Sequence, residues 1–310
     1  MTEDYAMNVG WIGTGRMGAA LCHRLLDGGV DLAVYNRTTS KTEPLAERGA
    51  TVVSSPAELA GRDMVFIMVA GPADVLEVTV GDRGVIAGPE LRPGILIDAT
   101  TIDSETSQIL RKAASEVGAS VLAAPVSGNP KVVESGKLTT VVSGPPDAYD
   151  TARPYLELFG RKVSYVGGED EARLVKIAHN LFLGVVAQSM AEITILAEAA
   201  GVSRADFLGF LNDSVMGSTF TRYKTPAYVN LDYEPSFTWH LLRKDFELCL
   251  AAGRELDVPL PTAALVHQII TEGIGIGYGD LDFAALLSKA AVGAGREITP
   301  DNVEVGDGLD

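Results

Sequence analysis

The residues with the clearest chemical meaning form a short glycine-rich turn near the N-terminus. Three glycines follow the pattern G-x-G-x-x-G in the segment Gly13-Thr14-Gly15-Arg16-Met17-Gly18. The first glycine of this pattern allows a tight turn, the second lets the backbone approach a pyrophosphate, and the third lets a helix pack closely on a strand. The N–H groups at the start of the following helix attract phosphate. The spacing therefore predicts the binding of a dinucleotide.

The elements around the turn make this prediction specific. An apolar strand at residues 9–12 precedes the turn, and a helical pattern follows it and stops at Gly28-Gly29. A second strand covers residues 32–35. Strand, glycine turn, helix and strand within about 30 residues are typical of a dinucleotide-binding unit. A turn whose glycines serve geometry alone is the weaker alternative.

The end of the second strand is the position that selects between NAD and NADP. NAD sites usually carry Asp or Glu there, about 20 residues after the glycines, to bind the ribose 2′-hydroxyl. This chain instead has Asn36, followed by Arg37 and Thr38. Neutral Asn36 does not repel a 2′-phosphate, and the Arg37 guanidinium can bind one through two hydrogen bonds. The segment favours NADP(H), with a solvated basic loop as the alternative.

Composition excludes several other classes of protein. The 310 residues suit one large or two modest domains, and a net charge of −16 argues against nucleic acid as a partner. No run of eighteen apolar residues occurs, so we expect no membrane span. The start, MTEDYAMN, lacks the features of a signal peptide, and the only cysteines, Cys22 and Cys249, fit a reducing cytoplasm. The four histidines show no metal-site spacing, so we expect no metal.

Strand and helix patterns alternate over residues 1–167. Apolar runs at residues 64–69, 95–98, 121–123 and 139–142 predict strands, with helical stretches between them. This alternation is typical of an α/β domain in which helices cover both faces of a doubly wound, mainly parallel sheet. We expect a Rossmann-type domain here, and its ligands should bind beyond the carboxyl ends of the strands.

After residue 167 the patterns become helical. A long segment at about 170–200 is apolar almost all round, which predicts a helix buried between other elements. Further helices are expected at residues 203–212, 238–256 and 261–272. We therefore expect an all-helical domain over residues 168–297, followed by an acidic, mobile tail at residues 298–310.

Further motifs resemble those of the β-hydroxyacid dehydrogenases, a family that includes 3-hydroxyisobutyrate dehydrogenase and glyoxylate/succinic semialdehyde reductase. The resemblance extends from Val9 to Leu287. Besides the glycine turn, the matching stretches are Asp98-Ala99-Thr100-Thr101-Ile102, Ala124-Pro125-Val126-Ser127-Gly128, Lys176-Ile177-Ala178-His179-Asn180, Lys244-Asp245 and Gly277-Tyr278-Gly279-Asp280-Leu281-Asp282-Phe283. Several spaced motifs in the right order are more specific than any one of them.

The resemblance implies reversible hydride transfer between a nicotinamide and a small β-hydroxy acid or semialdehyde. Lys176 takes the position of the family's catalytic lysine, a general acid/base that moves the proton accompanying the hydride. Asn180 lies four residues later on the same helix face, where the family uses it to orient substrate and lysine. His179 is a rival acid or base, although a packed or capped histidine is the simpler interpretation. The helical domain is implied to pair with a second subunit in a homodimer or homotetramer.

The resemblance also assigns a substrate site that holds a small carboxylate. Its residues are Ser127, Gly128, Asn129, Lys176 and Phe237. Asn129 replaces a second glycine of the family pattern, and the glyoxylate/succinic semialdehyde branch also replaces that glycine, by serine. The departure favours that branch, and the Asn129 amide could bind a second polar group or narrow the pocket.

Cofactor contacts are implied at four further positions. Val69, Ala70 and Thr101 correspond to residues along the cofactor, and Lys244 corresponds to a lysine that closes over the nicotinamide side. The plain alternative for Lys244 is a salt bridge on its own helix. Ala172 stands where the family often has glycine, and this second departure leaves the identity of the substrate open.

Two other functions stay open at this point. Related folds reduce imines, although those relatives usually carry Asp or Tyr in place of the lysine. A non-catalytic NADP-binding interaction module is the other alternative. The joint presence of Lys176, Asn180, Ser127 and Lys244 argues against it.

Overall fold

The computed structural model describes residues 5–88 and 91–309, and the first residues of the acidic N-terminal segment lie outside this range. Its contacts divide the chain into two compact units, Met1–Lys176 and Ile177–Asp310. Helix α7 (Glu171–Ala199) contains the boundary between them.

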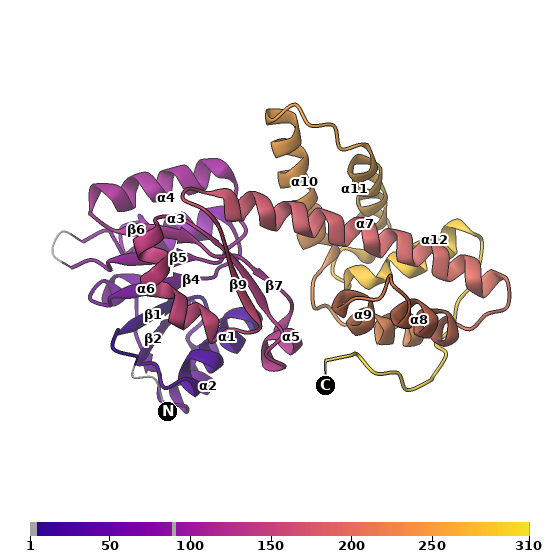
Figure 1. Cartoon of the computed structure of the whole chain (residues 1–310), viewed down its shortest axis with the longest axis horizontal. Helices are drawn as coiled ribbons and strands as arrows, with labels where there is room; N and C mark the ends of the chain where they lie inside the picture. Colours follow the sequence, from indigo (N-terminus) through magenta and orange to yellow (C-terminus); the bar gives the residue numbers. More distant parts are fainter. Residues whose placement is uncertain (1–4, 89–90, 310) are drawn as a thin grey trace. The chain divides into compact units, whose positions relative to one another are not determined.

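Unit 1 is built on a mixed sheet in which parallel strands dominate (Figure 1). The strands follow the spatial order β3-β2-β1-β4-β5-β6-β8-β7, with β9 paired to β8. All neighbours from β3 to β6 are parallel, whereas β8 runs antiparallel to β6 and β7. The strands are β1 (Val9–Ile12), β2 (Leu32–Tyr35), β3 (Thr51–Val52), β4 (Met64–Ile67), β5 (Ile95–Asp98), β6 (Ser120–Ala123), β7 (Val126–Ser127), β8 (Thr139–Ser143) and β9 (Lys162–Gly167).

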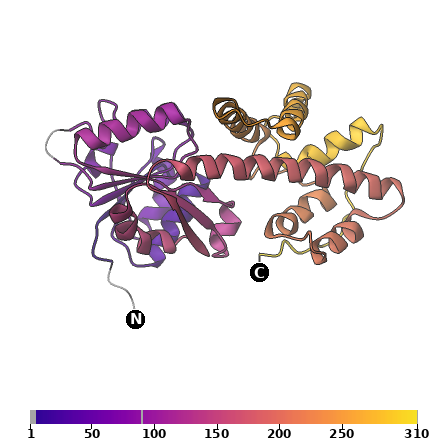
Figure 2. The same cartoon turned by 45° about the horizontal axis from the view of Figure 1, so that its top comes forward.

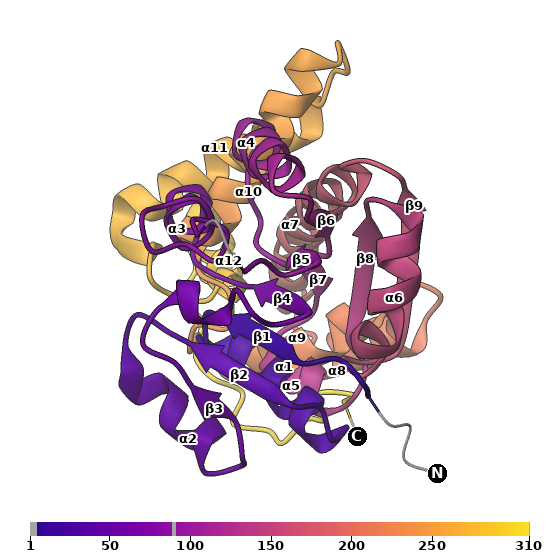
Figure 3. The same cartoon turned by 90° about the vertical axis from the view of Figure 1, so that its left-hand side faces the viewer.

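Helices cover both faces of this sheet (Figure 3). Residues of α3 and α4, such as Val75 and Leu110, share one core with Val65 and Ile67 of β4. On the opposite face Trp11 stacks on Phe66, with ring centroids 5.2 Å apart. The helices are α1 (Arg16–Asp27), α2 (Glu43–Ala46), α3 (Pro72–Thr79), α4 (Ser104–Glu116), α5 (Pro130–Glu134) and α6 (Pro146–Glu157), with short 3₁₀ turns at Thr39–Thr42 and Pro56–Leu59.

Unit 2 consists of helices around a separate core. Large side chains from several of them, including Met190, Tyr228, Trp239, Phe246 and Ile270, are buried together there. The elements are the rest of α7, α8 (Arg204–Asp213), α9 (Thr219–Asn230), α10 (Trp239–Glu255), α11 (Pro261–Gly273) and α12 (Leu286–Gly293), with short helical turns at Ile274–Tyr278 and Phe283–Ala285. The expected Rossmann-type domain and all-helical second domain are thereby confirmed.

Most elements begin and end within a few residues of the positions predicted from the pattern, but two helices were missed. Helix α9 has the polar and aromatic sequence TFTRYKTPAYVN with Pro226 in its interior, which masks the helical period. Proline normally breaks a helix, because it lacks the N–H donor and clashes with the preceding turn. Burial of Tyr228 and Val229 in the core of unit 2 stabilises the helix in spite of this. Helix α12 was the other omission.

The expectation that α7 is buried on all sides is wrong. Figure 2 shows one continuous helix, yet Phe182 is 67% and Leu196 is 70% exposed. By length and composition α7 could cross a membrane, with a mean hydropathy of 1.5 over its most apolar window. The core helix of a soluble protein passes the same test, and 44% of that window is buried. A single chain of this size thus leaves part of an apolar helix uncovered.

The acidic C-terminal segment, expected to be mobile, is instead attached to unit 2. Asp301 forms a 2.7 Å ion pair with the fully buried guanidinium of Arg204, and its backbone N–H donates to the carbonyl of Val229. Arg204 also pairs with Glu198 at 3.0 Å and donates to the Val229 carbonyl. Composition alone suggested a free tail, because the partner that fixes it lies almost 100 residues earlier in the chain.

We predict that Asp301→Ala loosens this segment. The substitution removes one of two carboxylates from a buried guanidinium, and hydrogen bonds to charged groups contribute about 1.5–3 kcal/mol. The melting temperature should fall, and limited proteolysis should cut within residues 298–309. Glu304→Ala, at an exposed position in the same segment, is the matched control. Equal melting and cleavage of the two variants would show that the ion pair does not hold the tail.

Candidate active site

The glycine turn connects β1 to α1 and has no room for side chains at two of its three glycines. Gly13 has φ +98°, and a Cβ there would lie 2.1 Å from the carbonyl oxygen of Met68. A Cβ on Gly18 would lie 2.0 Å from the carbonyl oxygen of Gly13. In contrast, a Cβ on Gly15 would meet no atom within 4 Å. The turn therefore presents open backbone at the uncapped start of α1, which fits a pyrophosphate.

The residues after β2 brace the turn and present a cation. Asn36 Oδ1 accepts from the backbone N–H of Thr14 at 2.9 Å, and Asn36 Nδ2 donates to the carbonyl of Thr38. Sequence reasoning missed this bracing role and considered only the neutral charge of Asn36. The Arg37 side chain is 75% exposed and pairs with Asp74 at the start of α3, 3.0 Å away. It lies at the surface of unit 1, where a phosphate could replace Asp74 as its partner.

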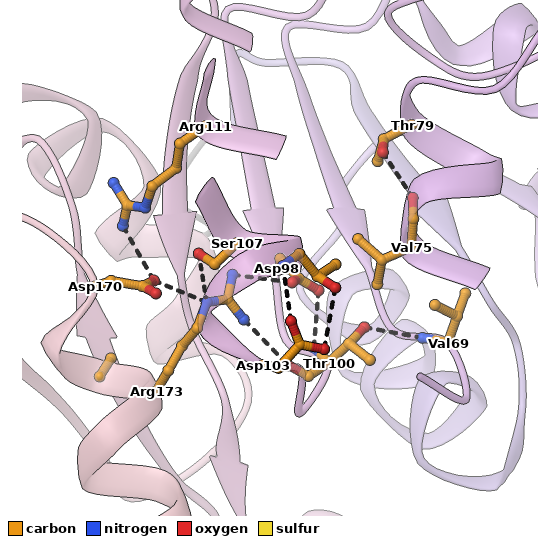
Figure 4. A network of polar contacts seen from close by, with 12 residues as sticks. Val69, Val75, Thr79, Asp98, Thr100, Asp103, Ser107, Arg111, Asp170 and Arg173 are labelled. Carbon is orange, nitrogen blue, oxygen red and sulfur yellow. Dashed lines mark hydrogen bonds and ion pairs between the residues drawn. The ribbon is translucent and has the colours of Figure 1, made fainter. Parts of the chain in front are cut away.

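The ends of β4 and β5 carry the next predicted cofactor residues. The register pairs Ile12 with Ile67 and Ile67 with Asp98, so the segments that follow β1, β4 and β5 emerge at one edge of the sheet. Val69 and Thr101 follow two of these ends. The Val69 N–H donates to Thr100 Oγ1 at 3.2 Å, which ties the two segments together (Figure 4). Sequence reasoning did not assign this role to Thr100.

The predicted substrate loop turns sharply between β7 and α5. Ser127 ends β7, and Gly128 has φ +144°, with Val132 and Leu138 side chains 2.8 Å from where its Cβ would lie. Asn129 caps α5, because its Oδ1 accepts from the N–H of Val132 at 3.1 Å. The amide oxygen of Asn129 therefore has a structural role as a helix cap, which the sequence analysis did not identify.

Lys176 and Asn180 lie one turn apart on α7, so they share a face of the helix. Lys176 is half-buried and belongs to unit 1, whereas Asn180 is buried and belongs to unit 2. The Nδ1 atom of His179, an exposed residue, lies 3.0 Å from the Asn180 side-chain oxygen. Of the other residues predicted for the site, Phe237 and Lys244 belong to unit 2.

Asp245 holds the Asn180 amide in unit 2. Asn180 Nδ2 donates to Asp245 Oδ2 at 2.6 Å, and the Asp245 side chain is 2% exposed. Lys244 Nζ lies 3.5 Å from the other carboxylate oxygen. The salt bridge proposed as the plain alternative for Lys244 is therefore present. The sequence motif named Asp245 but gave it no part in the site, because its partner is 65 residues away.

Phe237 is placed by the segment that leads into α10. Its ring packs edge-on against Phe283, with centroids 5.8 Å apart, and its N–H donates to the buried carboxylate of Asp282. Asp282 forms a 2.6 Å ion pair with Lys224. Burial lowers the pKa of Lys224, and the negative charge of Asp282 opposes that shift.

Comparison with known proteins agrees with this geometry. Residues 8–167 match the NAD-binding domain of 6-phosphogluconate dehydrogenase, and residues 171–290 match the NAD-binding region of NADP-dependent 3-hydroxyisobutyrate dehydrogenase. Glyoxylate/succinic semialdehyde reductase 1 of Arabidopsis thaliana is 32% identical over 91% of this chain and 97% of its own length.

Solved structures give the same result. 3-Hydroxyisobutyrate dehydrogenase from Salmonella typhimurium is similar with a TM-score of 0.82 and 27% identity, covering 91% of this chain and 99% of the other. Psf3 in complex with NADP+ and 2-OPP also has a TM-score of 0.82, with 28% identity over 90% of this chain and 99% of its own.

The matching family models, together with the Rossmann domain and the helical domain, place the chain among the pyridine-nucleotide-dependent oxidoreductases. The chain belongs to the 3-hydroxyisobutyrate dehydrogenase family of β-hydroxyacid dehydrogenases. The resemblance recognised from the sequence motifs is confirmed. The roles of the individual site residues stay predictions.

Proposed function

We propose that this protein is an NADP(H)-dependent enzyme that transfers hydride between the nicotinamide and a small β-hydroxy acid or semialdehyde. Glyoxylate and succinic semialdehyde are the proposed substrates. The observation that carries the proposal is the Lys176 and Asn180 pair on one face of α7, with the Asn180 amide held by buried Asp245. The name of the Arabidopsis relative supports the substrate class.

The proposed reaction needs a hydride and a proton. NADP(H), held by the glycine turn, would supply the hydride that the carbonyl carbon receives in reduction and would accept the hydride that the alcohol carbon loses in oxidation. Lys176 donates the proton to the carbonyl oxygen during reduction and takes it back during oxidation. Asn180 Nδ2 donates to Asp245. This hydrogen bond fixes the orientation of the amide group and therefore of its oxygen. Ser127 and the backbone N–H groups of the turn after it bind the substrate carboxylate.

The choice of NADP(H) depends on the exposed cation after β2. Among the residues that the structure describes, Arg37 forms ion pairs with two carboxylates of α3, Asp74 at 3.0 Å and Glu77 at 3.9 Å. Exposed ion pairs contribute little free energy, so a 2′-phosphate can displace them. Neutral Asn36 adds no repulsion. The NADP+ complex of Psf3 supports the same cofactor.

Arg37→Ala should weaken NADPH binding by about 10- to 100-fold, because one charge-assisted phosphate contact contributes about 1.5–3 kcal/mol. NADH binding should change little, since NADH lacks the 2′-phosphate. Cofactor fluorescence titration measures both affinities. Arg48→Ala removes another arginine that pairs with a carboxylate in unit 1, and this control should leave both unchanged. Equal wild-type affinities for NADPH and NADH would refute the assignment.

Lys176→Ala should lower kcat by about 10²- to 10⁴-fold, the usual contribution of general acid–base catalysis. NADPH affinity should stay nearly unchanged, because the phosphate-binding turn is untouched. Stopped-flow or steady-state NADPH oxidation measures the rate, with Lys112→Ala on the exposed face of α4 as control. Turnover within a few-fold of wild type would make Lys176 structural and His179 the next candidate.

The substrate should carry a carboxylate. NADPH oxidation with succinic semialdehyde should exceed that with butanal tenfold or more in kcat/KM, if one contact of about 1.5–3 kcal/mol distinguishes them. Ser127→Ala should raise KM for the acid and spare the uncharged aldehyde. Equal wild-type efficiency on the two aldehydes would contradict an anion site. In that case, NADPH oxidation with a panel of imines would test whether the enzyme reduces C=N bonds instead.

We also propose a homodimer or homotetramer joined through the helical domain. Phe182 and Leu196 on α7 and Phe210 on α8 are each more than 60% exposed. Sedimentation at micromolar concentration should therefore show an oligomer, and Leu196→Glu should weaken it. Leu91→Glu, at a 64% exposed position in unit 1, is the matched control. A stable wild-type monomer would contradict this assembly.

A further inference from the structure

A buried arginine joins the first turns of α7 to the sheet of unit 1. The Arg173 side chain is 7% exposed, and its Nη2 lies 3.0 Å from Oδ2 of Asp98, whose side chain is fully buried. Its Nε donates to Ser107 Oγ at 3.0 Å, and its Nη1 donates to the Thr100 carbonyl at 3.2 Å. Figure 4 shows the guanidinium reaching from α7 into this cluster at the end of β5. One side chain thus contacts a helix, a strand end and a loop.

The same cluster continues to the predicted cofactor edge. Asp98 Oδ1 accepts from the N–H of Thr100 at 2.9 Å, while Thr100 Oγ1 accepts from the N–H of Val69 at 3.2 Å. Val69 follows β4, and Thr100 immediately precedes Thr101. Arg173 is therefore linked, through Asp98 and then Thr100, to the two segments that are expected along the cofactor.

The charges of the cluster are balanced. Arg173 Nε also lies 2.8 Å from Asp170 Oδ1, and Arg111 on α4 lies 3.5 Å from the same carboxylate oxygen. Two guanidinium groups thus face the two carboxylates of Asp98 and Asp170. Because each buried charge has an opposite partner, the cluster avoids the large cost of an isolated buried ion.

Such a pair is better suited to fixing geometry than to adding stability. The loss of hydration of two buried charges offsets most of their attraction, and apolar residues in their place are often as stable. A guanidinium, however, is planar and directs its donors at fixed angles. An ion pair with Asp98 and hydrogen bonds to Ser107 and the Thr100 carbonyl together leave the start of α7 little freedom to move.

Lys176 is three residues further along the same helix, about 4.5 Å along its axis. We propose that Arg173 is a positioning residue that, through its pair with Asp98, sets the place of Lys176 relative to the cofactor edge of unit 1. This inference rests on the proposed function, because it takes Lys176 as the proton donor. The contacts themselves all lie within unit 1.

The test uses the full-length protein with NADPH and succinic semialdehyde. Arg173→Met should lower kcat by about 10- to 100-fold, since a misplacement near 1 Å can cost that much. NADPH affinity and KM for the acid should change less than about threefold, because Arg173 is not among the residues proposed to contact either ligand. Arg173→Lys keeps the charge without the planar fork and should restore part of kcat.

The double variant separates positioning from general damage. If Arg173 acts through Lys176, adding Arg173→Met to Lys176→Ala should lower kcat no further. Arg204→Met breaks a buried ion pair of unit 2 and is the stability control, so its kcat should stay near that of wild type. A further loss in the double variant, or an equal loss with Arg204→Met, would overturn the proposal.

Hydrogen exchange gives a readout that does not depend on activity. Arg173→Met should raise amide exchange in the peptide 171–180 and leave the α1 peptide unchanged. Unchanged exchange at 171–180 together with wild-type kcat would also overturn the proposal. If Lys176→Ala is fully active while Arg173→Met raises exchange at 171–180, Arg173 does fix the start of α7 but the proposed function fails.

Discussion

The parallel register of β1, β4 and β5 is the constraint on which the site depends. Ile12, Ile67 and Asp98 are the last residues of these strands and are paired in register. The chain therefore leaves the sheet three times at one edge, where it forms the glycine turn and the segments containing Val69 and Thr100. Since the strands are buried, a shift in register would break the core as well as the site. Core packing and ligand binding are thus enforced together.

Two buried carboxylates of this protein each connect segments that are far apart in the sequence. Asp98 accepts a hydrogen bond from the N–H of Thr100, in the loop after its own strand, and forms an ion pair with the guanidinium of Arg173. In unit 2, Asp282 plays a comparable part: it pairs with Lys224 and accepts from the backbone N–H groups of Ser236 and Phe237. That loop leads directly into α10, which carries Lys244 and Asp245. Each buried carboxylate thereby contacts the start of a helix that carries predicted site residues.

The chain has the architecture of its family, but its sequence departs from the family pattern at Asn129. Asn129 replaces a glycine, and its side chain caps a five-residue helix that begins beside the substrate loop. Such a cap stabilises the loop by about 1 kcal/mol relative to alanine. On α7, the apolar side chains of Phe182 and Leu196 are more than 60% exposed in the single chain.

Local pattern was enough to predict the two-domain architecture, the glycine turn and most helices and strands, because hydrophobic period and glycine spacing act over a few residues. Lys176 and Asn180, which lie on one helix, were assigned from the resemblance to a family and not from local pattern, and their roles stay predictions. Tertiary structure alone decided which carboxylate holds Asn180, where the C-terminal segment attaches and what Arg173 contacts. Arg173 and Ser107 are 66 residues apart, and Asn180 and Asp245 are 65 apart. No local pattern records such partners, because their hydrogen bonds exist only once the sheet and helices have packed.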